Sequence, residues 1–98
     1  MSVALEKINS KVEEIVSEVI GLEMKRFGFK SVHVEAGEDH DGDPVLLIEV
    51  RYSEGGAKID MRVVAQLLTK LRDRLWAAGE TRFPLIQHHF PKSRKVIG

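Results

Sequence analysis

The chain has 98 residues, of which 43% are hydrophobic and 31% are charged, a balance that is typical of one folded domain and excludes wholesale disorder. Fifteen basic and fifteen acidic side chains give a formal net charge of zero, which argues against a dedicated nucleic-acid-binding protein. The chain has no cysteine, so disulfides, zinc–cysteine centres and thiol catalysis are excluded.

Residues 3–27 are predicted to form a helix that ends at Gly28. Its apolar side chains recur at alternating steps of three and four, which also fits a short coiled coil. Whether the helix lies on a sheet or doubles as a dimer contact is therefore left open. Because charges are spread through this segment and no apolar stretch approaches the roughly 20 residues of a membrane span, we expect a soluble cytoplasmic protein without a membrane partner. The apolar stripe consists of Leu5, Ile8, Val12, Ile15, Val19 and Leu22, and Val16 and Ile20 widen it.

Two segments have the pattern of β-strands. Residues 31–36 alternate between small apolar and polar side chains, as a half-buried strand does. Residues 45–52 begin differently, because Val45 and Leu47 make a second face apolar. One layer of helices covers only one face of a sheet, so we expect the C-terminal tail or another subunit to cover these two residues. The acidic segment 37–44 joins the strands as a hairpin.

A second helix is predicted from Met61 to Ala78, with Asp60 as its N-cap and Trp76 at the boundary between its buried and solvent-facing sides. Residues 53–58 precede it as a loop with a flexible point at its paired glycines. The predicted buried stripe consists of Val64, Leu68, Leu71, Leu75 and Ala78, with Met61 and Leu67 alongside.

The C-terminal segment is predicted to be extended, because Pro84 and Pro91 rule out a helix. Leu85–Phe90 is a candidate third strand, reached from the second strand through a helix crossover. Residues 92–98 are expected to be a frayed tail. The whole chain, residues 1–98, is thus predicted to be a single α+β domain: helix, β-hairpin, helix and a C-terminal extended segment, in the order α-β-β-α-β.

The hairpin loop GEDHDGDP concentrates acidic side chains. Asp39, Asp41 and Asp43 alternate as the first ligands of a calcium loop do, and His40 suits a transition metal better. Pro44 stands where a calcium loop requires glycine, and the loop's final glutamate is missing. Acids, glycine and proline are also what an ordinary exposed turn contains. A divalent metal is therefore an alternative at this loop, and no other cofactor is expected.

The segment from residue 82 to residue 95 is basic, with four basic side chains and no acid. It is a candidate contact for phosphates, although four charges give only weak, salt-sensitive binding. The alternative is that it packs near the acidic loop, within one molecule or across a dimer. The candidate anion-binding residues are Arg82, Lys92, Arg94 and Lys95.

The adjacent histidines His88 and His89 point to opposite sides of an extended segment, so they cannot share one ion or one proton relay. The serines lie in no nucleophile motif, and no glycine loop has the residues of a phosphate cradle. No catalytic residue is predicted, and an enzyme is the less favoured class.

The segments GEDHDGDPVLLIEV and LRDRLWAAGETRFPLIQHHF resemble those of a family of small bacterial proteins of uncharacterised function and about this length. The likeness covers roughly the C-terminal two-thirds of the chain and implies no activity. The order of helix, hairpin and helix also resembles small RNA-binding α+β domains, including the KH type. The glycine-bracketed loop of that family is absent, because EGGAK has adjacent glycines, and no RNA-binding residues are carried over.

Three functions are consistent with these patterns. The first is a bacterial non-enzymatic accessory protein, homodimeric, that works by protein–protein contact. The second is a metal-dependent hydrolase or nuclease that uses the acidic loop, and the third is a nucleic-acid-binding or toxin–antitoxin component that acts through the basic tail. The interaction residues expected for the first are Val45, Leu47, Trp76, Phe83, His88 and His89.

Overall fold

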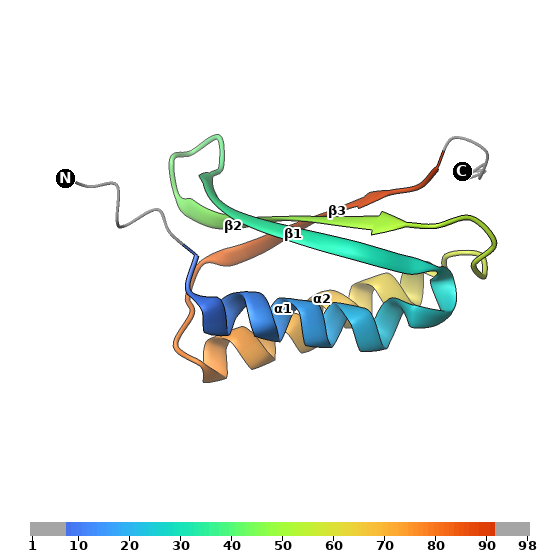
Figure 1. The fold of residues 1–98 in the computed structure, drawn as a ribbon. Helices are drawn as coiled ribbons and strands as arrows, with labels where there is room; N and C mark the ends of the chain where they lie inside the picture. The colour runs from blue at the N-terminus through green and yellow to red at the C-terminus, as the bar shows by residue number, and fades with distance from the viewer. Residues whose placement is uncertain (1–7, 92–98) are drawn as a thin grey trace.

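A computed structural model describes residues 8–91 of the chain. It contains α1 (Ser10–Met24), a 3₁₀ turn (Lys25–Phe27), β1 (Phe29–Glu38), β2 (Pro44–Tyr52), α2 (Met61–Ala77) and β3 (Phe83–His89). Figure 1 shows the two helices side by side against one face of a three-stranded sheet. The predicted α+β class and the α-β-β-α-β order are confirmed, including the third strand. The expected fraying at 92–98 lies outside the described residues.

The sheet has the order β1-β2-β3, with β2 in the centre. β1 and β2 form an antiparallel hairpin in which Val34 pairs with Ile48. β3 pairs with β2 in parallel, with Ile86 beside Ile48, and α2 is the crossover that this parallel pairing requires. None of the helices between residues 8 and 91 is long and apolar enough to cross a membrane.

Helix α1 begins at Ser10, because the Asn9 side chain caps it by accepting a hydrogen bond from the Lys11 backbone N–H (2.7 Å). Residues 3–7 of the predicted helix lie outside the described residues. The helix lies on the sheet, as the first of the two alternatives predicted. Its stripe is turned from the predicted one, since Leu22 is 72% exposed. The buried side is centred on Val16 and Ile20, which are both fully buried, and not on the row that contains Leu22. The buried residues are Val12, Ile15, Val16, Val19, Ile20 and Met24.

Helix α2 begins at Met61 with the predicted cap, because the Asp60 carboxylate accepts from the Arg62 backbone N–H (2.9 Å). The row of α2 residues that is buried against the sheet is Leu67, Leu71 and Leu75. The predicted stripe was partly wrong: Met61 and Ala78 are exposed, and Val64 and Leu68 are half-buried. The helix is therefore turned so that a second apolar row runs beside β3 instead of facing the core.

The loop between β2 and α2 is fastened to the turn that follows α1. The Ala57 backbone N–H donates to the Arg26 carbonyl (2.9 Å), and the Ser53 N–H donates to the Gly28 carbonyl (2.8 Å). Gly56 lies directly on this turn, where a Cβ would come within 2.4 Å of the Phe27 carbonyl carbon. Of the two paired glycines, which were predicted to be a flexible point, Gly56 is instead packed closely against the backbone of this turn.

Candidate interaction surface

The two edges of the sheet differ in charge. Within residues 8–91, β1 and β3 each have a neighbour on one side only. β1 carries Lys30, Glu35 and Glu38, and charged side chains on an edge strand oppose pairing with another chain. The run Phe83–Pro91 that contains β3 has no aspartate, glutamate, lysine or arginine. Pro84 removes one backbone N–H from β3, but in charge the edge at β3 is the less protected one.

A hollow of about 370 Å³, which we call the α2–β3 groove, runs between α2 and this open edge. Its lining includes side chains from both sides of β3, because Pro84 and Ile86 belong to the helix side while Phe83 and Leu85 alternate with them. The groove therefore follows the backbone edge of the strand. The residues that line it are Met61, Val64, Ala65, Leu68, Phe83, Pro84, Leu85, Ile86 and His88.

The helix side of the groove continues along α2. Spacings of three and four residues put five α2 residues on one face of the helix. We call them the α2 stripe. Met61 and Trp76, at its two ends, are 71% and 70% exposed, and Arg72 stacks over the Phe83 ring of β3 (5.1 Å from guanidinium carbon to ring centroid). This contact links the side of α2 to the start of β3. The α2 stripe consists of Met61, Ala65, Leu68, Arg72 and Trp76.

His88 closes one end of the groove and is held in place by aromatic contacts. The Tyr52 hydroxyl shares a hydrogen bond with His88 Nδ1 (2.6 Å), and the Tyr52 ring stacks on Phe90 with centroids 4.5 Å apart. Burial, with a contribution from the neighbouring His89, lowers the pKa of His88 from its ordinary value of 6.5. The ring is therefore neutral at pH 7, and the groove has an uncharged end.

The other face of the sheet holds three more of the predicted interaction residues. Val45 is only 2% exposed within the single chain, so no partner is needed to cover it. Leu47 is half-buried and lies where a side chain at Gly37 would be, because a Cβ there would come within 2.5 Å of Leu47 Cδ1. His89 lies on this face as well, with its Nε2 3.7 Å from Glu49 Oε1. Val45, Leu47 and His89 are thus not part of the α2–β3 groove, whereas Phe83 and His88 line it and Trp76 extends it along α2.

The acidic loop is organised by one of its own carboxylates. Asp39 Oδ1 accepts hydrogen bonds from the backbone N–H groups of Asp41 and Asp43, both at 2.9 Å. The Asp41 side chain is instead 72% exposed, and its Oδ2 lies 3.8 Å from His40 Nε2. Across residues 8–91, no group of three histidine or acidic side chains is close enough to hold a metal ion. Asp39 therefore stabilises the turn through these hydrogen bonds. The metal alternative is supported only by the sequence pattern of the loop.

Asp39→Ala is expected to lower the free energy of unfolding by about 1 kcal/mol, because two backbone N–H groups lose their acceptor. The Asp41 side chain, in the same loop, does not accept these backbone hydrogen bonds. Asp41→Ala is therefore expected to change the free energy of unfolding by less than about 0.5 kcal/mol. Urea unfolding of both variants measures the difference. Calorimetric titration with manganese, zinc and calcium is the companion test: a binding isotherm that both variants lose would favour the metal site instead.

Arg82 is engaged by an acid that immediately precedes the basic tail. Its Nε and Nη2 donate to the two carboxylate oxygens of Glu80 at 2.8 and 2.9 Å, and both side chains are largely buried. This pairing lowers the pKa of Glu80. The Arg82 guanidinium is thus already matched to a carboxylate. The other candidate anion contacts, Lys92, Arg94 and Lys95, lie outside the described residues.

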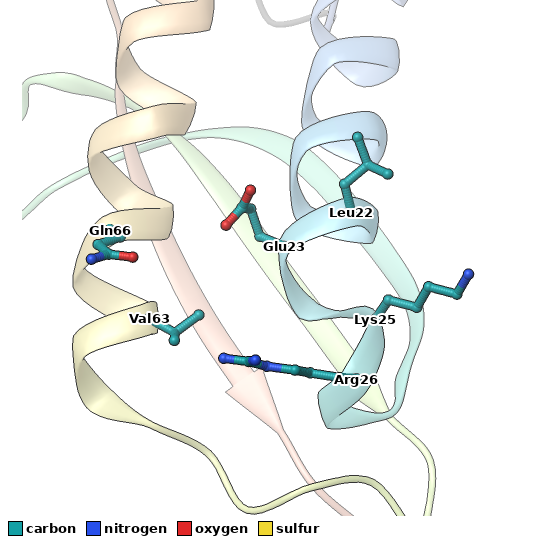
Figure 2. Close-up of a pocket in the computed structure, with 6 residues that line it drawn as sticks. All are labelled: Leu22, Glu23, Lys25, Arg26, Val63 and Gln66. Carbon is teal, nitrogen blue, oxygen red and sulfur yellow. The ribbon is translucent and has the colours of Figure 1, made fainter.

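A second hollow, of about 630 Å³, lies between the C-terminal end of α1 and the N-terminal half of α2. Figure 2 shows Glu23 and Val63 turned toward the gap, Arg26 reaching across it, and Leu22 and Lys25 directed away from α2. Ion pairs bridge the helices next to it, from Glu23 to Lys70 (3.0 Å) and from Glu18 to Arg74 (2.7 Å). This hollow is an open, mixed-polarity seam between two helices and groups no chemically reactive side chains.

No protein-family model matches the chain, and no significant match was found among curated proteins or solved structures. The function of the chain is therefore inferred from its own residues. The exposure of Met61 and Leu85 was not predicted from the sequence. The ion pair between Glu80 and Arg82 was not predicted either. The signal for Leu85 was present, because it lies in the uncharged run Phe83–Pro91. Met61 fits the spacing of the predicted buried stripe, so its exposure had no such signal.

Proposed function

We propose that the chain is a non-enzymatic accessory protein that works by protein–protein contact and forms a homodimer through the α2–β3 groove. The observation that carries the proposal is the distribution of exposed apolar side chains. Of the five large hydrophobic residues that are exposed between residues 8 and 91, four belong to α2 and β3: Met61, Trp76, Phe83 and Leu85. The fifth, Leu22, lies on α1.

A concentration of apolar surface of this kind is what distinguishes an interaction site from the scattered hydrophobic residues of an ordinary surface. The α2–β3 groove adds concave shape to it, and the uncharged strand removes the desolvation cost that charges would impose. The zero net charge of the chain also means that two copies do not repel each other as wholes. These properties together support association of like with like.

Leu85→Lys is expected to convert the homodimer to a monomer, because it places a charge in the α2–β3 groove and on the edge of β3. Sedimentation velocity at micromolar concentration measures the change, with the parent near twice the chain mass of 11.1 kDa and the variant near that mass. Leu85 is 37% exposed, so the substitution leaves the core intact.

Leu22→Lys is the matched control, because it adds the same charge at a more exposed leucine on α1 and is expected to leave the dimer unchanged. A parent protein that sediments as a monomer would contradict the proposal. Equal loss of the dimer in both variants would place the contact elsewhere on the molecule.

The two alternative functions gain no supporting contact from residues 8–91. The hydrolase or nuclease hypothesis needs free carboxylates in the acidic loop, and Asp39 is committed to the turn. The nucleic-acid or toxin–antitoxin hypothesis needs free cations in the tail, and Arg82 is paired with Glu80.

A further inference from the structure

We infer that two copies of the chain join β3 to β3 in antiparallel orientation, so that the sheet continues from three strands to six. This inference rests on the homodimer proposed above and assigns its mode of contact. An edge strand carries a row of unpaired N–H and C=O groups, and pairing with another strand satisfies them. The α2–β3 groove follows that row and is lined from both sides of β3. An added strand therefore has both backbone partners and side-chain contacts there.

A second copy of β3 fits this edge because the strand has no aspartate, glutamate, lysine or arginine. Like charges directly opposite each other destabilise a pair of strands, and an antiparallel pair of β3 strands places none opposite. The same pairing at the β1 edge would bring Lys30, Glu35 and Glu38 of two copies together. Pairing centred on Ile86 spans the strand and puts Leu85 of one copy opposite Gln87 of the other. Pro84, which has no N–H to donate, lies opposite His88 in this register.

The α2 stripe selects the register. Opposed side chains of two antiparallel strands point to the same face of the sheet, and side chains alternate between the faces along each strand. When the numbers of opposed residues sum to an even value, as they do around Ile86, the helix sides of the two copies therefore fall on the same face of the joined sheet. The N-terminal part of the stripe of one copy, from Met61 to Leu68, then faces that of the other and is covered. An odd sum would put the helices on opposite faces and leave Met61 of both copies exposed.

The position of α2 along β3 places Ala65, the smallest side chain of the α2 stripe, at the symmetry axis of the proposed dimer. The Arg72 guanidinium carbon lies 5.1 Å from the Phe83 ring centroid, and Ala65 and Ile86 both line the α2–β3 groove. From Arg72 to Ala65 the helix rises about 10 Å, and from Phe83 to Ile86 the strand advances about 10 Å in the same direction. Ala65 therefore lies level with Ile86, where the two α2 helices cross the axis. A small residue at that point lets the helices approach closely.

Disulfide cross-linking tests this arrangement, and the absence of native cysteine makes every cross-link assignable. Under mild oxidation, Ile86→Cys is expected to form a covalent dimer, because opposed residues of antiparallel strands have Cα atoms about 4.5–5.5 Å apart. A mixture of Leu85→Cys and Gln87→Cys chains is expected to form more mixed dimer than either chain alone forms with itself. Ser31→Cys, an exposed position on the β1 edge, is the control and is expected to stay monomeric on a non-reducing gel.

The outcomes separate the two proposals. If the parent sediments as a dimer but neither Ile86→Cys nor the Leu85–Gln87 mixture cross-links above the Ser31→Cys control, the β3 pairing is wrong while the homodimer stands. If the parent sediments as a monomer, both are wrong. Cross-linking of Leu85→Cys or Gln87→Cys with itself in preference to the mixture would overturn the register centred on Ile86.

Discussion

Leu71→Ala is expected to lower the free energy of unfolding by about 2–5 kcal/mol, the range found when a fully buried leucine is truncated and leaves a cavity. Leu71 is 0% exposed and lies in the middle of the α2 row that packs on the sheet. A domain of this size has a total stability of about 5–15 kcal/mol, so this single change removes a large part of it. Equilibrium unfolding in urea, followed by circular dichroism, gives the difference as a shift of the midpoint at unchanged slope.

Leu22→Ala is the control for this experiment. Leu22 belongs to a helix of the same layer but is 72% exposed, so its truncation is expected to change the free energy of unfolding by less than about 0.5 kcal/mol. Sequence periodicity alone places both leucines in buried stripes. Equal effects of the two substitutions would show that the assignment of buried faces to α1 and α2 is incorrect.

Gly56→Ala is expected to destabilise the protein by about 2–3 kcal/mol, because the added methyl group has no room. Its Cβ would lie 2.4 Å from the Phe27 carbonyl carbon and oxygen and 2.6 Å from the Gly28 nitrogen. These are backbone atoms, which cannot rotate away as a side chain can. The loop must lift from the turn instead, which weakens the Ala57 hydrogen bond to the Arg26 carbonyl. Thermal unfolding, with the same variant followed in urea, measures the loss.

Gly21→Ala provides the matched comparison for Gly56→Ala. A Cβ at Gly21 would meet the Phe29 ring at 3.7 Å, an ordinary contact, and the position lies inside α1. Alanine there is expected to stabilise the protein by roughly 0.5–1 kcal/mol through its helix propensity. The same chemical change thus has opposite signs at the two positions. A neutral Gly56→Ala would mean that the loop does not lie on the turn after α1.

Sequence patterns predicted the elements, their order and the third strand, because these depend on local features. Alternation at residues 31–36, the Asp60 cap and the restriction imposed by Pro84 each act over a few residues. The rotation of each helix about its axis was predicted less well. Leu22 and Met61 satisfy an apolar spacing but are exposed, since the sheet determines which of two neighbouring rows is buried.

The candidate site could be predicted only in part, because it is defined by which edge of the sheet stays open. Phe83, Trp76 and His88 were expected at an interface from their chemistry, and the structure places them at or beside the α2–β3 groove. The roles of Asp39 and Arg82 depend on partners two to four residues away in a folded turn, which composition does not reveal. Val45 was expected to need cover, and the protomer supplies it.

The one-sided packing of the sheet also determines where the sequence can vary. Along β2, Leu46, Ile48 and Val50 are each at most 1% exposed, so mutational tolerance at these positions is confined to side chains of similar volume. Glu49 and Arg51, between and after them, project from the opposite face and pair with each other at 3.3 Å. Substitution of Arg51 disturbs only this surface ion pair, which contributes little, whereas substitution of Glu49 also removes its contact with His89. Permissive and restrictive positions therefore alternate residue by residue through the centre of the molecule.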